Sequence, residues 1–345
     1  MKEGTRLRKY FSEFGLNVFT SYKTIVPVEH LDKVQNNAEY HIYGILSIPR
    51  VILDKESFTV SEDGFKCILK RVNPDCGENF EINEFSILPG IDHRQFKYDI
   101  KYPFDKLHYQ IDNEILLDFY RNNKQSMNLS ESEFKGLFSM PLDAQILLNR
   151  HLNENWISLE MEVLYIGQSF GTDGQRIAQD RLSAHSTLQK ILTDFHSKYP
   201  DRRIYLLLLE MTPLLNASFD GLSKEYMVSD EEDQEHFEKV LNNLPIEEQV
   251  INITEAAMIN YFKPYYNTNF IENFPSSKHK GYKQYFDLDY NCVSVELDLE
   301  FDNMPNIELY TDSNRIRSSW DFIEYNLFND PNRKNLYEIF ASKPE

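Results

Sequence analysis

Residues 203–211, RIYLLLLEM, constrain the fold more than any other part of the chain. The consecutive residues 205–209 are all apolar or aromatic, so this segment has no polar face. A short run bounded by charged residues is typical of a strand buried on both sides, and it is much shorter than a membrane-spanning helix. The sequence therefore predicts a central strand that is covered on both faces, and no contact with a membrane.

The surrounding pattern divides the chain into three regions. Residues 1–145 contain alternating segments such as YHIYGILSI and FKCILKRV and end in helical segments. Residues 146–270 hold the apolar strand and two helical segments, and residues 271–345 alternate again in VSVELDLEF and NIELY. The expected fold class is α+β, with a domain at 146–270 between a β-rich N-terminal region and a C-terminal β/α extension.

Cysteine usage and the N-terminal sequence bear on location. The three cysteines, Cys67, Cys76 and Cys292, form no CxxC pair, which argues against a zinc knuckle and against a disulfide framework. The first residues, MKEGTRLRKYFSEFG, lack the apolar core of a signal peptide. These features favour a reducing, cytoplasmic location.

The net charge of -19 argues against a protein that coats nucleic acid, because phosphate contacts require Lys and Arg. The charge is uneven: residues 165–205 carry six Lys or Arg against four Asp, and residues 263–285 carry four Lys against one Glu. These patches form either a local anion site or ordinary surface variation. The acidic residues 230–248 are interpreted as a solvated insertion.

Residues 162–185, EVLYIGQSFGTDGQRIAQDRLSAH, contain candidate residues for a functional site. A strand ending in Tyr165 and Gly167 can place a phenol at the mouth of a site, although a cross-strand aromatic before a turn has the same pattern. On the helix predicted from Asp180 to His196, Arg181 and His185 share one face. They could hold a phosphate and transfer a proton, or they could be a solvated helix face.

A second helix is predicted at residues 251–263, INITEAAMINYFK, and ends before Pro264. It carries the carboxylate of Glu255. Glu255 could bind a hard divalent ion, but the spacing from Asn252 also fits a capping box at the start of a helix. Asn267 follows the helix and could cap a turn.

Taken in order, YIGQS, Arg-x-x-x-His and EAAMINYFKPYYN resemble the GIY-YIG nuclease superfamily over residues 155–270. The resemblance implies a small domain with a central antiparallel sheet flanked by helices, which cuts DNA with Mg or Mn. It also implies a role for each matching residue. Tyr165 would lie at the scissile phosphate, Arg181 would stabilise the charge on the phosphoryl group, His185 would transfer or position a proton, Glu255 would hold the metal, and Gly167 and Asn267 would support the site.

The chain departs from the family in its first motif, which places another tyrosine on the strand before Tyr165. No tyrosine occurs between Tyr120 and Tyr165. Trp156 lies near the expected place but has no useful acid–base group, and His151 is a nearby substitute. Two hypotheses therefore stay open. The chain is a metal-dependent endonuclease, with a restriction or phage-defence role by family analogy, or it is a catalytically reduced binding or regulatory subunit that acts in a complex.

Candidate DNA contacts are Arg176 in the glycine-containing loop and the lysines of SKHKGYKQYF, namely Lys278, Lys280 and Lys283. Lysines interleaved with tyrosines suit phosphate contacts and base stacking, although a plain polar loop has the same composition. DNA is the expected partner. Because the whole chain is acidic, a protein partner that supplies positive surface is expected as well.

Overall fold

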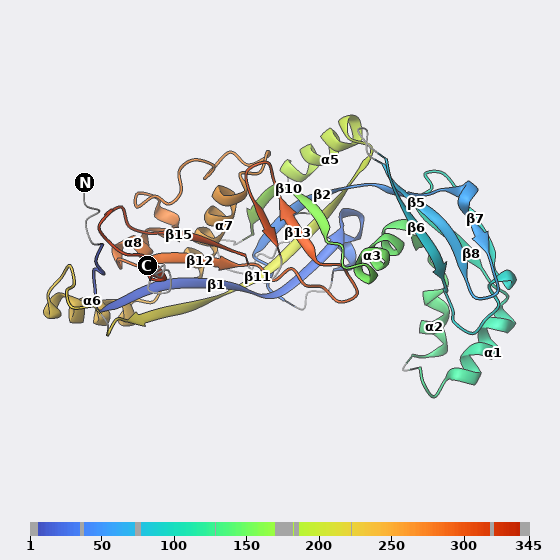
Figure 1. Ribbon diagram of the computed structural model, residues 1–345, viewed down its shortest axis with the longest axis horizontal. Coiled ribbons are helices and arrows are strands. Elements are labelled where there is room, and N and C mark those ends of the chain that lie inside the picture. The colour runs from blue at the N-terminus through green and yellow to red at the C-terminus, as the bar shows by residue number, and fades with distance from the viewer. Residues whose placement is uncertain are drawn as a thin grey trace, which may run out of the picture.

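An eight-stranded sheet dominates the molecule (Figure 1). The computed structural model describes residues 6–34, 38–72, 77–127, 129–169, 182, 186–221, 223–317 and 321–338. The strand order is β14-β13-β10-β2-β11-β1-β12-β15, and all neighbours are antiparallel except the parallel pairs β1–β12 and β10–β13. The strands are β1 (Ser12–Pro27), β2 (Ile42–Pro49), β10 (Leu159–Gln168), β11 (Arg202–Phe219), β12 (Cys292–Glu296), β13 (Ile307–Tyr310), β14 (Arg315–Arg317) and β15 (Phe322–Asn326).

The predicted doubly covered strand is confirmed as β11, which lies between β2 and β1 and buries every residue from 204 to 209. Successive side chains on a strand point to opposite faces. Leu206 and Leu208 pack into a core with α5 (Ser186–Lys198), whereas Leu207 and Leu209 pack into another core with α7 (Glu247–Phe262). The alternation therefore places the two helices that flank the candidate site on opposite faces of the sheet.

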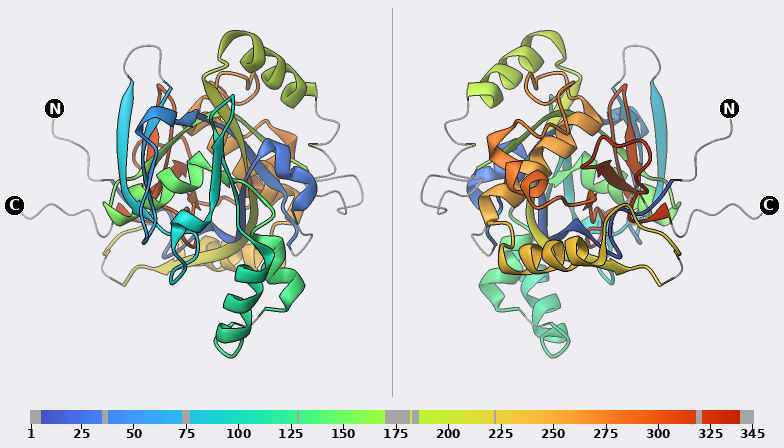
Figure 2. Two further views of the ribbon diagram at one scale, coloured as in Figure 1. Left: turned by 90° about the vertical axis from the view of Figure 1, so that its right-hand side faces the viewer. Right: turned by 90° about the vertical axis from the view of Figure 1, so that its left-hand side faces the viewer.

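Two smaller sheets follow β2 in the chain. One has the order β3-β5-β4, with β6 paired to β5, and the other has the order β7-β8-β9. The segment with α1 and α2 projects from the rest of the molecule (Figure 2). The bounds are β3 (Val51–Leu53), β4 (Thr59–Val60), β5 (Phe65–Arg71), β6 (Glu78–Phe85), β7 (Lys97–Ile100), β8 (Lys106–Gln110) and β9 (Leu142–Asp143). The other helices are α1 (Asn113–Asn123), α2 (Glu131–Leu137), α3 (Ala144–Glu154), α6 (Asp230–Asn242) and α8 (Lys283–Asp287), with 3-10 turns η1 (Val28–Lys33), η2 (Lys55–Ser57), η3 (His93–Gln95) and η4 (Lys280–Tyr282).

The acidic run is not a solvated insertion, because most of it forms α6. Ser229 and Glu232 make a reciprocal capping box at its start, which satisfies free N–H groups of the first turn. His236 is buried and its ring stacks on Tyr10 at a centroid distance of 3.8 Å. Most acidic side chains of this helix are exposed, whereas Asp233 accepts hydrogen bonds from the N–H and hydroxyl of Ser12, so the inner face of α6 packs against the N-terminal segment.

The end of the described chain is tied to β1 by buried charges. The Arg333 guanidinium contacts the Glu13 carboxylate at 2.6 Å, and both side chains are buried. Asp289 also pairs with Arg333 at 2.6 Å. Since a buried charge is stable only when it is paired, these contacts fix the C-terminal segment against the sheet.

The expectation of a small domain with its own central sheet flanked by helices is wrong. Strands β10, β2 and β11 do lie side by side, but they belong to the eight-stranded sheet, which adds β1 from the N-terminal region and β12 to β15 from the C-terminal region. The error has a physical reason. Unpaired backbone groups at a sheet edge accept any strand of suitable length, so the local sequence pattern does not reveal how far a sheet extends.

Among the helices that the structure describes, none combines the length and the apolar character needed to cross a bilayer.

Candidate functional site

Two tyrosines face each other across neighbouring strands at the candidate site. In the antiparallel pair of β2 and β10, Tyr43 lies opposite Gly167 and Ile45 lies opposite Tyr165. The two tyrosine rings therefore lie on one face as diagonal neighbours, with centroids 6.2 Å apart and planes inclined by 34°. Tyr43 is fully buried, whereas Tyr165 is half-buried.

Gly167 explains how the tyrosines approach so closely. A Cβ atom at this position would lie 2.6 Å from the Tyr43 hydroxyl oxygen and 2.7 Å from the Tyr165 ring. Carbon contacts this short are strongly repulsive, so only glycine fits. The glycine of the Tyr-Ile-Gly motif thus provides the space in which both phenol groups meet the backbone of β10.

Asn267 pairs with the part of β10 that lies beyond its pairing with β13, which covers only residues 159–162 of β10. Its Oδ1 accepts a hydrogen bond of 2.9 Å from the Ile166 N–H, and its Nδ2 donates one of 2.8 Å to the Ile166 carbonyl. The amide side chain therefore pairs with the strand as another backbone segment would. The Tyr266 N–H adds a bond of 3.1 Å to the Leu164 carbonyl, so the loop after α7 is anchored along the strand.

A polar cavity of about 290 Å³ brings the predicted residues together at this edge. Tyr165, Glu255 and Asn267 all line it, from β10, α7 and the loop that follows α7. Among the residues that the structure describes, the lining consists of Tyr165, Gln168, Thr187, Glu255, Ile259, Tyr266, Asn267, Thr268, Asn269 and Phe270. Residues separated widely in the chain therefore contribute a phenol, a carboxylate, amides and hydroxyl groups to one space.

Glu255 does not start a helix. The helix α7 begins at Glu247, so Glu255 lies in its middle and the capping-box alternative with Asn252 is wrong. The Asn252 side chain instead accepts a hydrogen bond of 3.0 Å from Gln168 at the end of β10. This contact holds α7 against the strand and leaves Glu255 on the wall of the cavity.

Tyr266 is held at another wall of the cavity. Its hydroxyl donates to Asp194 at 3.0 Å. Burial and this carboxylate raise the pKa of Tyr266 well above its ordinary value, so the phenol stays protonated. Hydrogen bonds from Lys198 and Tyr266 lower the pKa of Asp194. Lys190 lies 5.8 Å from the centre of the Tyr266 ring, which places a cation from the basic 165–205 patch beside the site.

Three predicted residues, Arg176, Arg181 and His185, lie outside the described residues. Leu182, from the same segment, is buried and packs in the core beneath α5. The helix predicted from Asp180 is described from Ser186 to Lys198.

The lysine-rich segment differs from the expectation in its aromatic residues. Lys278, Lys280 and Lys283 are exposed, and Lys283 pairs with Asp287 at 3.1 Å. Tyr282 and Tyr285, however, are fully buried. Base stacking on these tyrosines is therefore excluded, and only the lysines can reach a phosphate backbone.

Tyr43 is the residue that sequence reasoning missed. The signal was present in His41-Ile42-Tyr43-Gly44, but this segment precedes the interval in which a first-motif tyrosine was expected. Trp156 does not take that place, because it is 91% exposed in the turn after α3. His151 points elsewhere as well, since its ring packs edge-on against Phe80 of β6 at 5.8 Å.

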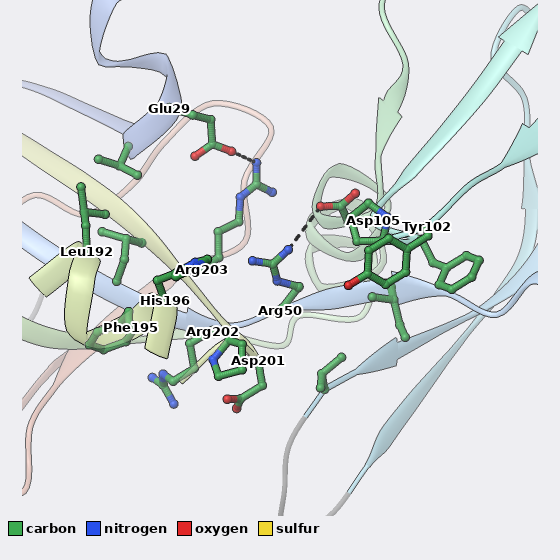
Figure 3. Close-up of a pocket in the computed structure, with 17 residues that line it drawn as sticks. Glu29, Arg50, Tyr102, Asp105, Leu192, Phe195, His196, Asp201, Arg202 and Arg203 are labelled. Atoms are coloured by element: carbon green, nitrogen blue, oxygen red, sulfur yellow. Dashed lines mark hydrogen bonds and ion pairs between the residues drawn. The ribbon is translucent and has the colours of Figure 1, made fainter. Parts of the chain in front are cut away.

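A larger cavity, about 780 Å³, lies elsewhere and is lined by none of the predicted residues (Figure 3). Its arginines already have acidic partners. Arg203 pairs with Glu29 at 2.6 Å, and Arg50 lies 3.6 Å from Asp105. This cleft lies where β2 leaves the eight-stranded sheet and continues into β3.

Comparison with known proteins identifies no relative. A scan with protein-family models, a search of curated proteins and a search of solved structures each found no match. The geometry of the site is therefore the basis for assigning a function.

Proposed function

We propose that this chain is a divalent-metal-dependent endonuclease that hydrolyses DNA phosphodiester bonds, related to the GIY-YIG nucleases by its site. One observation carries the proposal. Tyr43 and Tyr165 meet over Gly167 on adjacent antiparallel strands, and Tyr165 lines the same cavity as Glu255. Tyr43 would supply the tyrosine that the first motif of that family requires, from β2, which precedes the two smaller sheets in the chain.

The cavity offers what phosphodiester hydrolysis needs from a protein. Glu255 would hold Mg or Mn, and the amides of Gln168 and Asn269 add the oxygen ligands that such hard ions prefer. The ion would supply Lewis-acid stabilisation of the charged phosphoryl oxygens. Tyr165, which lines the cavity, would orient the attacking water, and the buried Tyr43 beside it would help to move the proton, since a phenol can both donate and accept.

The resemblance assigns the remaining charge stabilisation to Arg181 and the remaining proton transfer to His185, and both assignments belong to this proposal. Arg176, Lys278, Lys280 and Lys283 would contact the DNA backbone. Because the net charge is -19, a protein partner that adds positive surface is part of the proposal. So are a cytoplasmic location and a restriction or phage-defence role, the latter by analogy with the family alone.

The second candidate is a binding or regulatory subunit with reduced chemistry. The observation in its favour is the strongly negative charge, which repels DNA at long range. The missing first-motif tyrosine was its other support. That support weakens because Tyr43 lies directly opposite Gly167.

A cleavage assay on the full chain tests the proposal. Supercoiled plasmid and single-stranded DNA are incubated with the wild-type protein, Glu255→Gln and Glu248→Gln, in Mg, in Mn and in EDTA. Glu248 is exposed on the same helix and serves as the matched control. We expect nicking that requires metal, that Glu255→Gln abolishes and that Glu248→Gln retains. Cleavage of equal rate by Glu255→Gln would contradict the assigned site, and no cleavage by folded protein would favour the binding subunit.

A further inference from the structure

Three ligand-type side chains converge where β2 begins, apart from the cavity described above. His41 immediately precedes β2 and is only 5% exposed. Its Nε2 lies 3.6 Å from a carboxylate oxygen of Glu247, the first residue of α7, and 3.9 Å from one of Glu39. All three donor atoms lie within 4.8 Å of one another.

These separations are close to those of a metal centre. Ligands about 2.0 to 2.1 Å from a tetrahedral ion are about 3.3 Å from each other. Small side-chain rotations would bring the carboxylates to that spacing, and both Glu39 and Glu247 are exposed and able to make them. The imidazole, by contrast, is fixed by its burial.

The two carboxylates beside His41 place negative charge at this position, which favours the binding of a cation. In the part of the chain that the structure describes, the ion pairs formed by Glu39 and Glu247 both go to His41, and neither carboxylate has a Lys or Arg within 4.0 Å. Two carboxylates that share one neighbour repel each other. A divalent ion between them would neutralise both.

The backbone around the ligands is already ordered by hydrogen bonds. The His41 carbonyl accepts a bond of 2.9 Å from the Ser169 N–H at the end of β10, and the Glu39 N–H donates one of 3.0 Å to Glu210 of β11. Ligands on a supported backbone lose little conformational freedom when an ion binds. The three ligands come from two segments far apart in the chain, so an ion here would join them.

We propose that Glu39, His41 and Glu247 bind one divalent transition-metal ion, of the class of Zn²⁺ and Co²⁺, which fixes the first turn of α7 to the start of β2. An imidazole ligand favours such ions over Mg²⁺ or Ca²⁺, which prefer oxygen alone. Glu247 and Glu255 are eight residues apart in α7. Eight residues span about 12 Å at roughly 1.5 Å each. Paired catalytic ions are only about 4 Å apart. This site is therefore structural and does not depend on the proposed nuclease function.

Direct metal binding tests the proposal without any activity measurement. Metal-free full-length protein is titrated with Co²⁺, followed by its visible absorption, and with Zn²⁺, followed by calorimetry. We expect one saturable site whose affinity falls by about tenfold or more in His41→Gln and Glu247→Gln, since the loss of a group that only supports a metal ligand already costs about that much. Glu248→Gln, an exposed neighbour in the same turn, keeps the wild-type affinity.

Two further measurements separate loss of metal binding from loss of folding and from loss of the nuclease site. Glu247 is exposed, so Glu247→Gln folds even if the buried His41→Gln variant does not; circular dichroism checks this. Glu255→Gln retains Zn²⁺ binding, which separates this site from the nuclease proposal. Wild-type Zn²⁺ and Co²⁺ affinity in Glu247→Gln, or no saturable binding by the wild-type protein, overturns the proposal.

Discussion

The cleft of Figure 3 and the cavity beside β10 differ in the way that their polar groups are engaged. The cleft of Figure 3 has a volume of about 780 Å³, and its arginines face acidic partners from the cleft itself or beside it. The cavity at the edge of β10 has only about 290 Å³, but a phenol, a carboxylate and several amides converge in it. Chemistry requires unlike polar groups that reach one point, so the smaller cavity is the better candidate for a site.

The origins of the two cavities also differ. The cleft lies where the chain leaves one sheet for another, and the Arg50 backbone is tied there to the Asp201 carbonyl at 2.6 Å. Such a gap arises wherever two sheets meet at an angle. The cavity at β10 instead depends on specific residues, since Gly167 makes room for two tyrosines and Asn267 pairs with the strand edge.

The largest effect is expected from Tyr43→Phe. Loss of the hydroxyl should lower DNA cleavage about 100-fold or more, because a positioned proton-transfer group contributes at least that much. Stability should fall by about 1 kcal/mol at most, since only one hydroxyl is removed. Single-turnover cleavage and thermal unfolding measure the two quantities. Arg50→Gln in the cleft is the control and should cleave DNA at the wild-type rate. Equal cleavage rates for Tyr43→Phe and wild type would contradict a role for Tyr43 in cleavage.

Gly167→Ala should reduce the free energy of unfolding by about 1 to 3 kcal/mol, because the added methyl group meets the Tyr43 hydroxyl and the Tyr165 ring. Urea unfolding measures this change. The matched control is Gly136→Ala in α2, where an added Cβ meets nothing within 4 Å. That change should be neutral or slightly stabilising, since alanine favours helices. Equal effects in the two variants would mean that close packing at Gly167 is unimportant.

Asn267→Ala should cost about 1 to 3 kcal/mol, because it leaves the Ile166 N–H and carbonyl without their side-chain partner. Asn269→Ala, an exposed residue of the same cavity, is the control and should cost less than about 0.5 kcal/mol. Urea unfolding distinguishes them, and hydrogen exchange should show faster exchange at Ile166 in Asn267→Ala alone. Unchanged protection at Ile166 would contradict the role given to Asn267.

The smallest effect is expected in the cleft, as a pH dependence. Burial opposes ionisation of Glu29, but its backbone hydrogen bond and Arg203 prevail and lower the pKa of that carboxyl. A lowered folded-state pKa stabilises the protein above the ordinary Glu value of about 4.3, and the stabilisation is lost as the pH falls further. Because the pair is partly exposed, Glu29→Gln should remove only a few tenths of a kcal/mol at pH 7.

Urea unfolding at neutral pH and near pH 3.5 follows this dependence. The difference between wild type and Glu29→Gln should shrink as the pH falls. If the difference in free energy of unfolding between wild type and Glu29→Gln grows on acidification, the pair of Glu29 and Arg203 does not stabilise the protein.

Several features of the site followed from sequence because they are local. The apolar run predicted β11, the periodicity predicted α5 and α7, and the motif order pointed to Tyr165, Glu255 and Asn267, which the structure places around one cavity. Other features were predicted wrongly because the sequence does not show where a helix begins. Glu255 fitted a capping box only because the start of α7 at Glu247 was not recognised.

The sequence by itself determined the uninterrupted apolar run that buries β11, the glycine that admits two phenol groups, and the residue types available for chemistry. Only the tertiary structure decided that Tyr43 lies opposite Gly167 and that the motif strands share an eight-stranded sheet. The reason is physical. Periodicity and turn signals are set by neighbours along the chain, whereas strand pairing joins backbone groups that are alike at every residue. A partner strand is therefore selected by the packing of the whole molecule.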